Sequence, residues 1–196
     1  MERISLVFVL LFLASCTTTS ELAIDRPQSQ TFSLDEHLIK VFSDGSGSFG
    51  RPDEMTVLGN TWHFTAHRDE MTDTPVITAY RVGQWSLSGR MISHSLGVYL
   101  NFSKADMEQI CVFGHDFPGR IAMLRVGDNP PVQTNENGCT ILTLNLDEQL
   151  RSNKSIKVRG VVWPEEWEKT IDVNIDGYDT LTRFLRLTRT NIEKGM

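Results

Sequence analysis

One short acidic segment is the first candidate for chemistry in this sequence of 196 residues. Asp69, Glu70 and Asp73 bring three carboxylates together within Arg68–Asp73. Such a cluster can bind calcium, and a pair of carboxylates can act as acid and base in hydrolysis. The oxygen spacing of an EF-hand is absent, however, and a catalytic pair needs positions that a fold must set. We predict a solvated hairpin turn here and keep a calcium site and a hydrolase as alternatives.

Two histidines four residues apart, His63 and His67, would be able to share a metal ion if they lay on a helix. The neighbouring Trp62, Phe64 and Ala66 alternate with them, which is typical of a strand. Residues four apart on a strand are separated by about 13 Å, too far for one zinc ion to bridge. The sequence therefore predicts surface histidines and no metal site.

The segment Gly45–Gly50 matches the glycine pattern of dinucleotide-binding loops, G-x-G-x-x-G. That site needs a strand before the loop and a helix after it, whereas polar residues precede this segment and Arg51-Pro52 follows it. We predict a flexible loop and no cofactor. The chain also lacks a G-x-S-x-G nucleophile motif, so the sequence indicates no catalytic residues and a protein that is not an enzyme.

The first sixteen residues indicate where the protein is sent. Mostly apolar residues run from Ile4 to Ala14, behind the basic Arg3. As a helix this run spans about 16 Å, short of the ~30 Å hydrocarbon core of a membrane, so it is typical of a signal peptide. It ends in Leu13-Ala14-Ser15-Cys16, which resembles the bacterial lipobox. In lipobox proteins the Cys thiol receives a diacylglyceryl group, and the chain is cut just before that Cys.

The lipobox resemblance implies that residues 1–15 are a cleaved signal peptide and that Cys16 carries the lipid. In lipoproteins an Asp directly after the Cys retains the protein at the inner membrane. Thr17 stands here instead, which favours the outer membrane on its periplasmic side. Several acyl chains would hold the protein there almost permanently. The alternative is an ordinary secretory signal with a chance Cys at its end.

Two further cysteines remain, Cys111 and Cys139. In an oxidising compartment such as the periplasm, the simplest use for such a pair is a disulfide. This bond would close a loop of about 29 residues, stabilise the fold by roughly 3.6 kcal/mol and hold the two Cα atoms about 5.5 Å apart. A metal pair or a reactive thiol is the competing interpretation, although neither Cys has a Cys-x-x-Cys partner or a His at ligand spacing.

Composition and charge narrow the classes of function and fold. The formal net charge is -6, which leaves no electrostatic footprint for binding nucleic acid. Hydrophobic residues make up 40% of the chain, as in ordinary globular domains. We expect residues 16–55 to form a lipidated N-terminus and a flexible tether, with one or two helical turns in Leu34–Phe42. A β domain then spans residues 56–196.

From about residue 56 the sequence alternates between apolar and polar residues, the pattern of half-buried strands. Two helices interrupt the strands, Asp147–Asn153 and Tyr178–Asn191, and the second has arginines near its end that suit the helix dipole. The spacing predicts a mainly β fold, an antiparallel β-sandwich or barrel-like domain with a short internal helix and a C-terminal amphipathic helix. The strand runs are Trp62, Phe64 and Ala66; Val76, Thr78, Tyr80 and Val82; Leu96, Val98, Leu100 and Phe102; Ile110–Phe113; Ala122, Leu124 and Val126; Thr140–Leu144; Ile156, Val158 and Val162; and Trp167, Ile171, Val173 and Ile175.

The segment Trp163-Pro164-Glu165-Glu166-Trp167 places two tryptophans beside a turn, with acids between them. Pro164 favours extended backbone at Trp163, and a Trp at a loop edge offers a large apolar area to a partner. Glu165 and Glu166 would steer a basic partner toward it. We predict a binding surface formed by these four side chains. The alternative is that both rings are buried beneath the tether.

The domain from Thr61 to Leu187 resembles accessory proteins associated with bacterial type VI secretion and related small phage and envelope lipoproteins. That family usually has Phe where Ile171 stands. The resemblance implies a similar β domain and no enzymatic activity. The features that carry it are the strand headed by Trp62, the turn Asp69–Asp73, Cys111 with Gly138-Cys139, the Lys-rich strand Lys154–Arg159, and Ile171–Gly177 followed by a helix from Leu181.

We expect a non-enzymatic outer-membrane lipoprotein that binds another protein, either an envelope component or an incoming one. An inhibitor, immunity or phage-exclusion lipoprotein is the runner-up. An envelope hydrolase that uses the carboxylates near Asp69 is a third hypothesis. We expect neither nucleic acid nor a small-molecule cofactor among the ligands.

Overall fold

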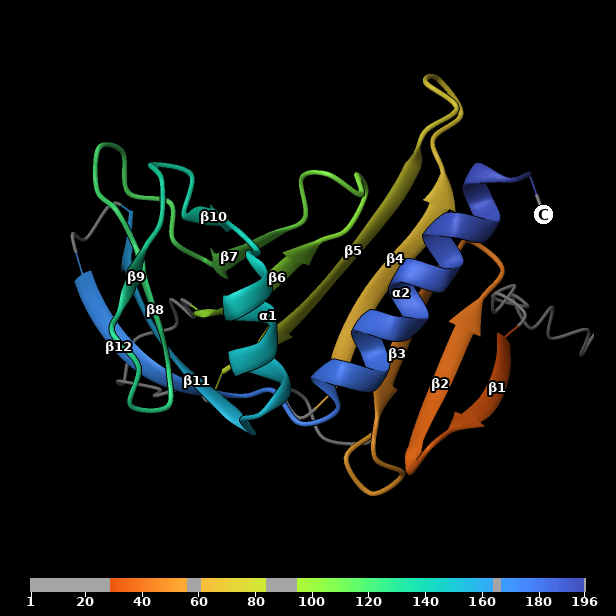
Figure 1. Ribbon diagram of the computed structural model, residues 1–196, viewed down its shortest axis with the longest axis horizontal. Coiled ribbons are helices and arrows are strands. Elements are labelled where there is room, and N and C mark those ends of the chain that lie inside the picture. The colour runs from red at the N-terminus through yellow and green to blue at the C-terminus, as the bar shows by residue number, and fades with distance from the viewer. Residues whose placement is uncertain (1–28, 56–60, 84–94, 164–166, 196) are drawn as a thin grey trace, which may run out of the picture.

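Two antiparallel sheets and two helices make up the computed structural model, which describes residues 29–55, 61–83, 95–163 and 167–195 (Figure 1). The larger sheet has the strand order β1-β2-β3-β4-β5-β6-β7-β10, and the smaller has the order β12-β11-β8-β9. The helices are α1 (Leu144–Arg151) and α2 (Tyr178–Glu193). The strands are β1 (Ser29–Leu34), β2 (His37–Phe42), β3 (Ser46–Gly50), β4 (Trp62–Arg68), β5 (Pro75–Val82), β6 (Gly97–Asn101), β7 (Gln109–Phe113), β8 (Met123–Val126), β9 (Val132–Gln133), β10 (Cys139–Ile141), β11 (Ser155–Val162) and β12 (Trp167–Asn174).

One face of the larger sheet carries the core. Phe64, Ala79, Leu100 and Ile110 lie side by side across four neighbouring strands, and all four are buried. The run Leu96–Phe102 alternates as predicted, because its four apolar residues are all buried. Burying one face of an antiparallel sheet requires a second layer of structure over that face.

The smaller sheet and α2 together form this second layer. Gly160 of β11 lies so close to the larger sheet that an added Cβ would come within 2.9 Å of the Leu96 side chain. Phe184 of α2 packs on Phe64, with ring centroids 5.3 Å apart. The predicted mainly β sandwich, with a short internal helix and a C-terminal helix, is therefore confirmed. Neither helix of the described ranges has the length and apolar character that crossing a membrane requires.

Residues 29–50 correct the predicted tether. They form β1, β2 and β3, with Ile39 and Phe49 fully buried in the core. The prediction of helical turns in Leu34–Phe42 is wrong, because this segment forms the end of β1, the turn and β2 of a β-hairpin. The alternation was hidden in the sequence because the outer face of β2 carries the apolar Leu38 and Phe42, which blurs the contrast between the two faces.

The glycine-rich segment Gly45–Gly50 is also ordered rather than a flexible loop. Gly45 has a φ of 80° in the turn, and the remainder forms β3. Gly47 leaves room for the Phe64 ring, because an added Cβ there would lie 2.2 Å from the Phe64 Cζ atom. These glycines allow β3 to pack closely against a large neighbour.

β5 buries the face opposite to the run that the sequence suggested. Its buried residues are Ile77, Ala79 and Arg81, and the guanidinium of Arg81 is fully buried. Arg81 Nη1 donates to the carbonyl oxygen of Asp176 at 3.2 Å, and Nη2 lies 3.7 Å from the Glu54 carboxylate. The inner face of β5 is hard to recognise in the sequence because the charged Arg81 occupies a core position. The outer face carries Val76, Thr78, Tyr80 and Val82.

The turn between β12 and α2 is held at Asp176. Its carbonyl oxygen also accepts from Trp62 Nε1 at 3.2 Å, and its carboxylate accepts from Arg51 Nε at 2.8 Å. The next residue, Gly177, has a φ of 78°, and a Cβ there would lie 2.7 Å from His37 Nε2. These contacts explain why α2 begins at Tyr178 and lies against the larger sheet.

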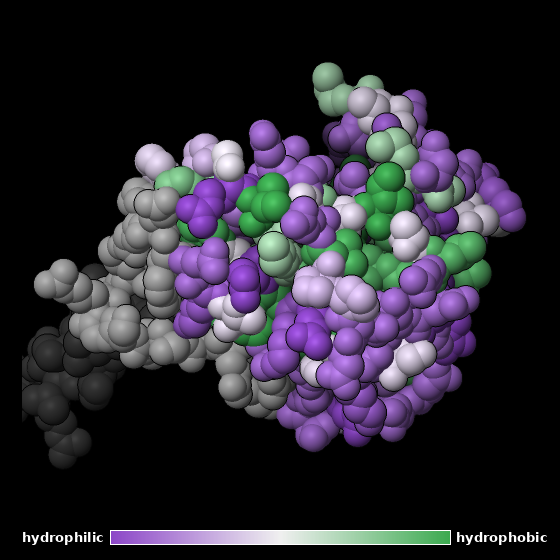
Figure 2. Space-filling view, turned by 60° about the vertical axis from the view of Figure 1, so that its left-hand side comes forward, coloured by the Kyte–Doolittle hydropathy of each residue, from purple (hydrophilic) through white to green (hydrophobic). Residues whose placement is uncertain are grey.

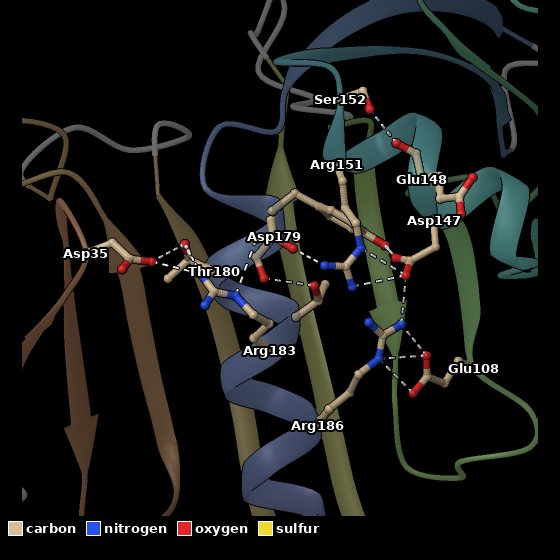
Figure 3. Close-up of polar contacts among 12 residues, drawn as sticks. Asp35, Glu108, Asp147, Glu148, Arg151, Ser152, Asp179, Thr180, Arg183 and Arg186 are labelled. Carbon is tan, nitrogen blue, oxygen red and sulfur yellow. Dashed lines mark hydrogen bonds and ion pairs between the residues drawn. The ribbon is translucent and has the colours of Figure 1, made fainter.

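The arginines of α2 form ion pairs with carboxylates on other elements, beyond their expected role near the helix end. Glu108, just before β7, accepts from Arg186 Nη2 at 2.6 Å (Figure 3). It also accepts from Arg189 Nη1 at 2.9 Å. Arg183 Nη2 donates to Asp35 in the β1–β2 turn at 2.8 Å. The helix is thereby tied to the β1–β2 turn and to the β6–β7 segment of the larger sheet.

α1 joins the same network through Asp147. This carboxylate accepts from Arg151 at 3.1 Å, and Arg151 also pairs with Asp179 (Figure 3). The hydroxyl of Tyr178 donates to the same carboxylate at 2.7 Å. Burial, and then the Asp147 charge, raise the pKa of Tyr178 far above its usual value. The phenol therefore stays protonated and serves as a donor between the two helices.

Candidate functional site

Trp163 stands exposed at the end of β11. Its side chain retains 54% of its accessible surface, whereas Val161 and Val162 before it are buried. The Trp163 N–H donates to Asp116 Oδ1 at 2.7 Å, which fixes the backbone where the strand ends. The alternative that this ring is buried is therefore wrong. A half-exposed indole on fixed backbone offers apolar area whose backbone needs no further ordering.

The loop 114–121 supplies the support for this indole. Phe117 packs against Trp163 with ring centroids 5.3 Å apart and an angle of 57° between the planes. Ile121, at the end of the loop, is 42% exposed. Phe117 contacts the indole, Asp116 accepts from the Trp163 N–H, and Ile121 adds an exposed apolar side chain at the end of the same loop. We call these four residues the Trp163 surface.

His115 attaches the loop to β11. It is buried, and its Nδ1 lies 3.0 Å from the amide nitrogen of Val161 while Nε2 lies 3.1 Å from the carbonyl oxygen of Arg120. Nδ1 also lies 3.0 Å from the carbonyl oxygen of Val161, so both backbone groups of Val161 face this ring nitrogen, and a proton on Nε2 lets Nε2 donate to Arg120. Gly160 makes room, because an added Cβ would lie 3.3 Å from His115 Cβ.

The predicted disulfide between Cys111 and Cys139 is confirmed, and it encloses the loop. The two residues lie directly opposite each other on β7 and β10, with Cα atoms 3.9 Å apart rather than the predicted 5.5 Å. In an antiparallel ladder, opposite residues that exchange no hydrogen bonds with each other lie closest together. Cys111 and Cys139 are such a pair, because the neighbouring ladder bond runs from the Val112 N–H to the Gly138 carbonyl oxygen. Gly138 also packs on His115.

Charges around the Trp163 surface are mixed. Arg120 and Glu168 form an exposed ion pair with 3.5 Å between nitrogen and oxygen. Glu165 and Glu166 lie outside the described residues. Trp167 begins β12, opposite Val162, and its side chain lies outside the described structure. Of the four predicted binding residues, the structure thus describes the side chain of Trp163.

The remaining sequence candidates that the structure describes lie away from this surface, on β4 and in the turn that follows it. Asp69 caps the β4–β5 hairpin turn, as predicted, and its Oδ1 accepts from Thr72 N–H at 2.8 Å. Hydrogen bonds from Thr72, hydroxyl first, and from Met71 hold the pKa of Asp69 below its usual value. His63 and His67 lie on β4, as the alternation predicted. Cys16 lies outside the described residues.

The described part of the chain contains no group of three His, Cys, Asp or Glu side chains able to hold a metal ion. At the Trp163 surface the available chemistry is apolar contact, one carboxylate acceptor and a nearby ion pair. Such a set suits recognition of another molecule by burial of an aromatic side chain.

Sequence reasoning found Trp163 but missed its supports. The His115 ring meets Val161, 46 positions further along the chain, and Phe117 lies between Gly114 and Gly119, a pattern that predicts only a turn. The available signal was an aromatic and a histidine between Gly114 and Gly119. These residues meet β11 only because β7 and β11 belong to sheets that pack together.

No family model and no curated protein matches this sequence. A distant similarity exists to the crystal structure of invasion associated protein B from Bartonella henselae, at 15% sequence identity. The match covers 82% of this chain and 99% of that chain, with a TM-score of 0.37. A TM-score this low is no evidence for a shared fold or a shared function.

Proposed function

We propose that this chain is a lipid-anchored lipoprotein of the bacterial outer membrane, facing the periplasm, and that it acts as a non-enzymatic accessory module that binds another protein. The observation that carries the binding role is the Trp163 surface, with its half-exposed indole on a supported loop. The disulfide supports an oxidising compartment, where such bonds persist. The resemblance in Trp62, Cys111 and Cys139 favours a secretion-associated module among such proteins.

The partner should be basic where it meets this surface. Asp116 is exposed beside the indole, and Glu165 and Glu166 follow Trp163 in the sequence. Acidic side chains around an aromatic anchor accelerate association with a basic partner. Salt screens these charges, so the acceleration decreases as the salt concentration rises. The same chemistry would serve an inhibitor or immunity lipoprotein, and the identity of the captured partner separates these roles.

Replacing Trp163 with Ala should weaken partner binding by about 2 kcal/mol, or roughly thirtyfold, while changing the stability of the fold by less than about 1 kcal/mol. The ring is half exposed, so its loss leaves little cavity. The matched control is Trp62→Ala, which removes a fully buried ring and should lower the free energy of unfolding by about 3–5 kcal/mol. Urea titration measures both stabilities.

Binding is measured by site-specific photocrosslinking in cells, with the reactive amino acid placed at Ile121. Ile121→photocrosslinker should give one discrete product that weakens when Trp163→Ala is added and when salt rises. The same amino acid at Met71, which is 93% exposed at the tip of the β4–β5 hairpin, is the control position. A product of equal strength from both positions, or one that survives Trp163→Ala, contradicts the binding role of this surface.

The lipid anchor is tested by Cys16→Ser. This variant should lose all label from an alkyne fatty acid and leave the membrane fraction, because the Cys thiol is the group that would receive the lipid. A Ser15→Ala variant keeps the Cys and a small residue before it, and it should label like the wild type. Equal labelling of wild type and Cys16→Ser would contradict the lipoprotein assignment without affecting the binding surface.

A further inference from the structure

The edge strand β1 differs from the other sheet edges in the described structure. It has six residues, none of them charged, and within the described ranges it pairs with β2 alone. The other edges are short or charged: β9 has two residues, β10 has three, and β12 carries Glu168, Lys169 and Asp172. Proteins protect edges in these ways because a long, uncharged edge templates pairing with another strand. β1 is therefore suited to strand pairing.

The hairpin between β1 and β2 determines which backbone groups point outward. Its turn consists of Asp35-Glu36, and Leu34 lies opposite His37. In a two-residue hairpin the pair beside the turn exchanges both hydrogen bonds, and every second residue of β1 then bonds to β2. The intervening residues direct their N–H and C=O groups to the open side, and these are Ser29, Thr31 and Ser33.

We propose that β1 pairs with β1 of a second copy of this chain, antiparallel, with Thr31 on the two-fold axis. In this register Thr31 meets the Thr31 of the copy, and Ser29 meets its Ser33. All three outward-directed residues then exchange hydrogen bonds, as an isologous contact requires. The larger sheets of the two copies become one continuous sheet.

The residue types of β1 favour its own copy as the occupant. A two-fold contact brings like residues together, so a charged strand would repel itself, whereas β1 carries no charge. Ser29, Thr31 and Ser33 share one face of the sheet, and hydroxyl side chains in opposing positions stabilise strand pairs. An edge protected against its own copy would carry a Lys or a Pro at its centre.

Exposed apolar side chains lie beside the proposed junction. Phe32 is 42% exposed, and its ring lies 6.1 Å from that of Phe184 on α2. Leu187, 66% exposed, follows Phe184 by three positions and therefore neighbours it on the helix surface. Figure 1 shows β1 at the sheet edge, beyond α2. A two-fold axis perpendicular to the sheet puts both copies of α2 on the same side, with these side chains flanking the junction.

The register is tested by introducing a positive or a negative charge at Thr31. The full chain is used, purified in the mature form that cells produce. Thr31→Lys and Thr31→Glu should each raise the dimer dissociation constant at least about tenfold, because each places two like charges on the axis. An equimolar mixture of the two variants should restore the dimer, because Lys then meets Glu. Sedimentation velocity measures the mass. Thr170→Lys and Thr170→Glu, at an exposed threonine of the edge strand β12, should leave the dimer intact.

Both Thr31 variants should melt within a few degrees of the wild type, since the side chain is exposed and its outward N–H does not bond to β2. A second measurement avoids dilution: Thr31→Cys should form a disulfide-linked homodimer in cells. A wild-type monomer with no such crosslink, a dimer unaffected by Thr31→Lys, or a mixture that stays monomeric would overturn the proposal. So would a Thr31→Cys crosslink to a different protein, which would assign β1 to a foreign strand. None of these outcomes depends on the lipid anchor or on the Trp163 surface.

Discussion

Glu108→Gln should lower the free energy of unfolding by about 3 kcal/mol, although it changes few atoms. The Glu108 side chain is 12% exposed and accepts hydrogen bonds from two guanidinium groups, those of Arg186 and Arg189. The neutral amide removes the nearest counter-charge of both cations, which leaves Arg186 with Asp147 at 3.3 Å and Arg189 with Glu193 at 3.9 Å. It also turns an NH2 group toward at least one donor, which creates an unsatisfied contact.

The expected loss of stability is large because the ion pairs of Glu108 with Arg186 and Arg189 take the place of water around partly buried charges. Removing one partner of such a pair costs about 3–5 kcal/mol when both are buried, and the 26% exposure of Arg186 places the expected loss at the lower end. Glu108 also connects the β6–β7 segment to α2, and Arg189 Nη1 additionally donates to the carbonyl of Phe102 at 2.9 Å. The loss should therefore appear first as weaker docking of α2.

The matched control is Glu148→Gln on the exposed side of α1, which should change stability by less than about 0.5 kcal/mol. Urea titrations followed by tryptophan fluorescence and by circular dichroism measure both variants. Equal stabilities for Glu108→Gln and Glu148→Gln would mean that the cluster contributes no net stability.

Replacing both disulfide cysteines, Cys111→Ser with Cys139→Ser, should destabilise the fold by about 3 kcal/mol. The bond closes a loop of about 29 residues, and the entropy of closing that loop in the unfolded chain gives roughly 3.6 kcal/mol. The two serine hydroxyls that replace the half-buried disulfide compensate for little of this loss of stability. The double variant avoids a free thiol, which would reshuffle with other cysteines.

Wild-type protein treated with a reductant under native conditions provides the comparison. Its midpoint of urea unfolding should fall to that of the double variant, and the double variant should not respond to reductant. Maleimide labelling under denaturing, non-reducing conditions should find Cys111 and Cys139 blocked in protein from the cell envelope. Two free thiols there would contradict the disulfide as the native state.

The disulfide should also affect binding, because the loop it closes contains Asp116 and Phe117. These residues support Trp163, and His115 between β7 and β11 lies against Gly138 beside Cys139. We expect the double variant to lose part of its partner capture even at temperatures where it remains folded, because the supporting loop becomes more mobile.

The sequence predicted the strands whose two faces differ clearly. Leu96, Val98, Leu100 and Phe102 alternate with less apolar neighbours, and the same holds for Trp62, Phe64 and Ala66 on β4. The C-terminal helix was predicted within a few residues of its observed bounds, and the cysteine pair was predicted from the count of cysteines and the expected compartment. These predictions rest on the contrast between apolar and polar neighbours along the chain and on the number of cysteines.

Prediction failed where the outer face is apolar or the inner face is polar. Leu38 and Phe42 on the outside of β2 remove the contrast on which period two depends, so the sequence predicts a tether where the structure has three strands. Arg81 on the inside of β5 reversed the apparent buried face, because its charge is met by Asp176 and Glu54 from distant segments. No local pattern records such partners.

The sequence by itself therefore determined the β class, the C-terminal helix, the cysteine pair and an aromatic beside a turn. Tertiary structure alone decided that Trp163 stands exposed on Phe117, that Glu108 meets two arginines of α2, and that β1 is an uncharged edge strand among the described strands. The physical reason is the same in each case. Alternation and helical periodicity are properties of neighbours along the chain, whereas these contacts join residues dozens of positions apart, which meet only when two sheets and a helix bury a common apolar face.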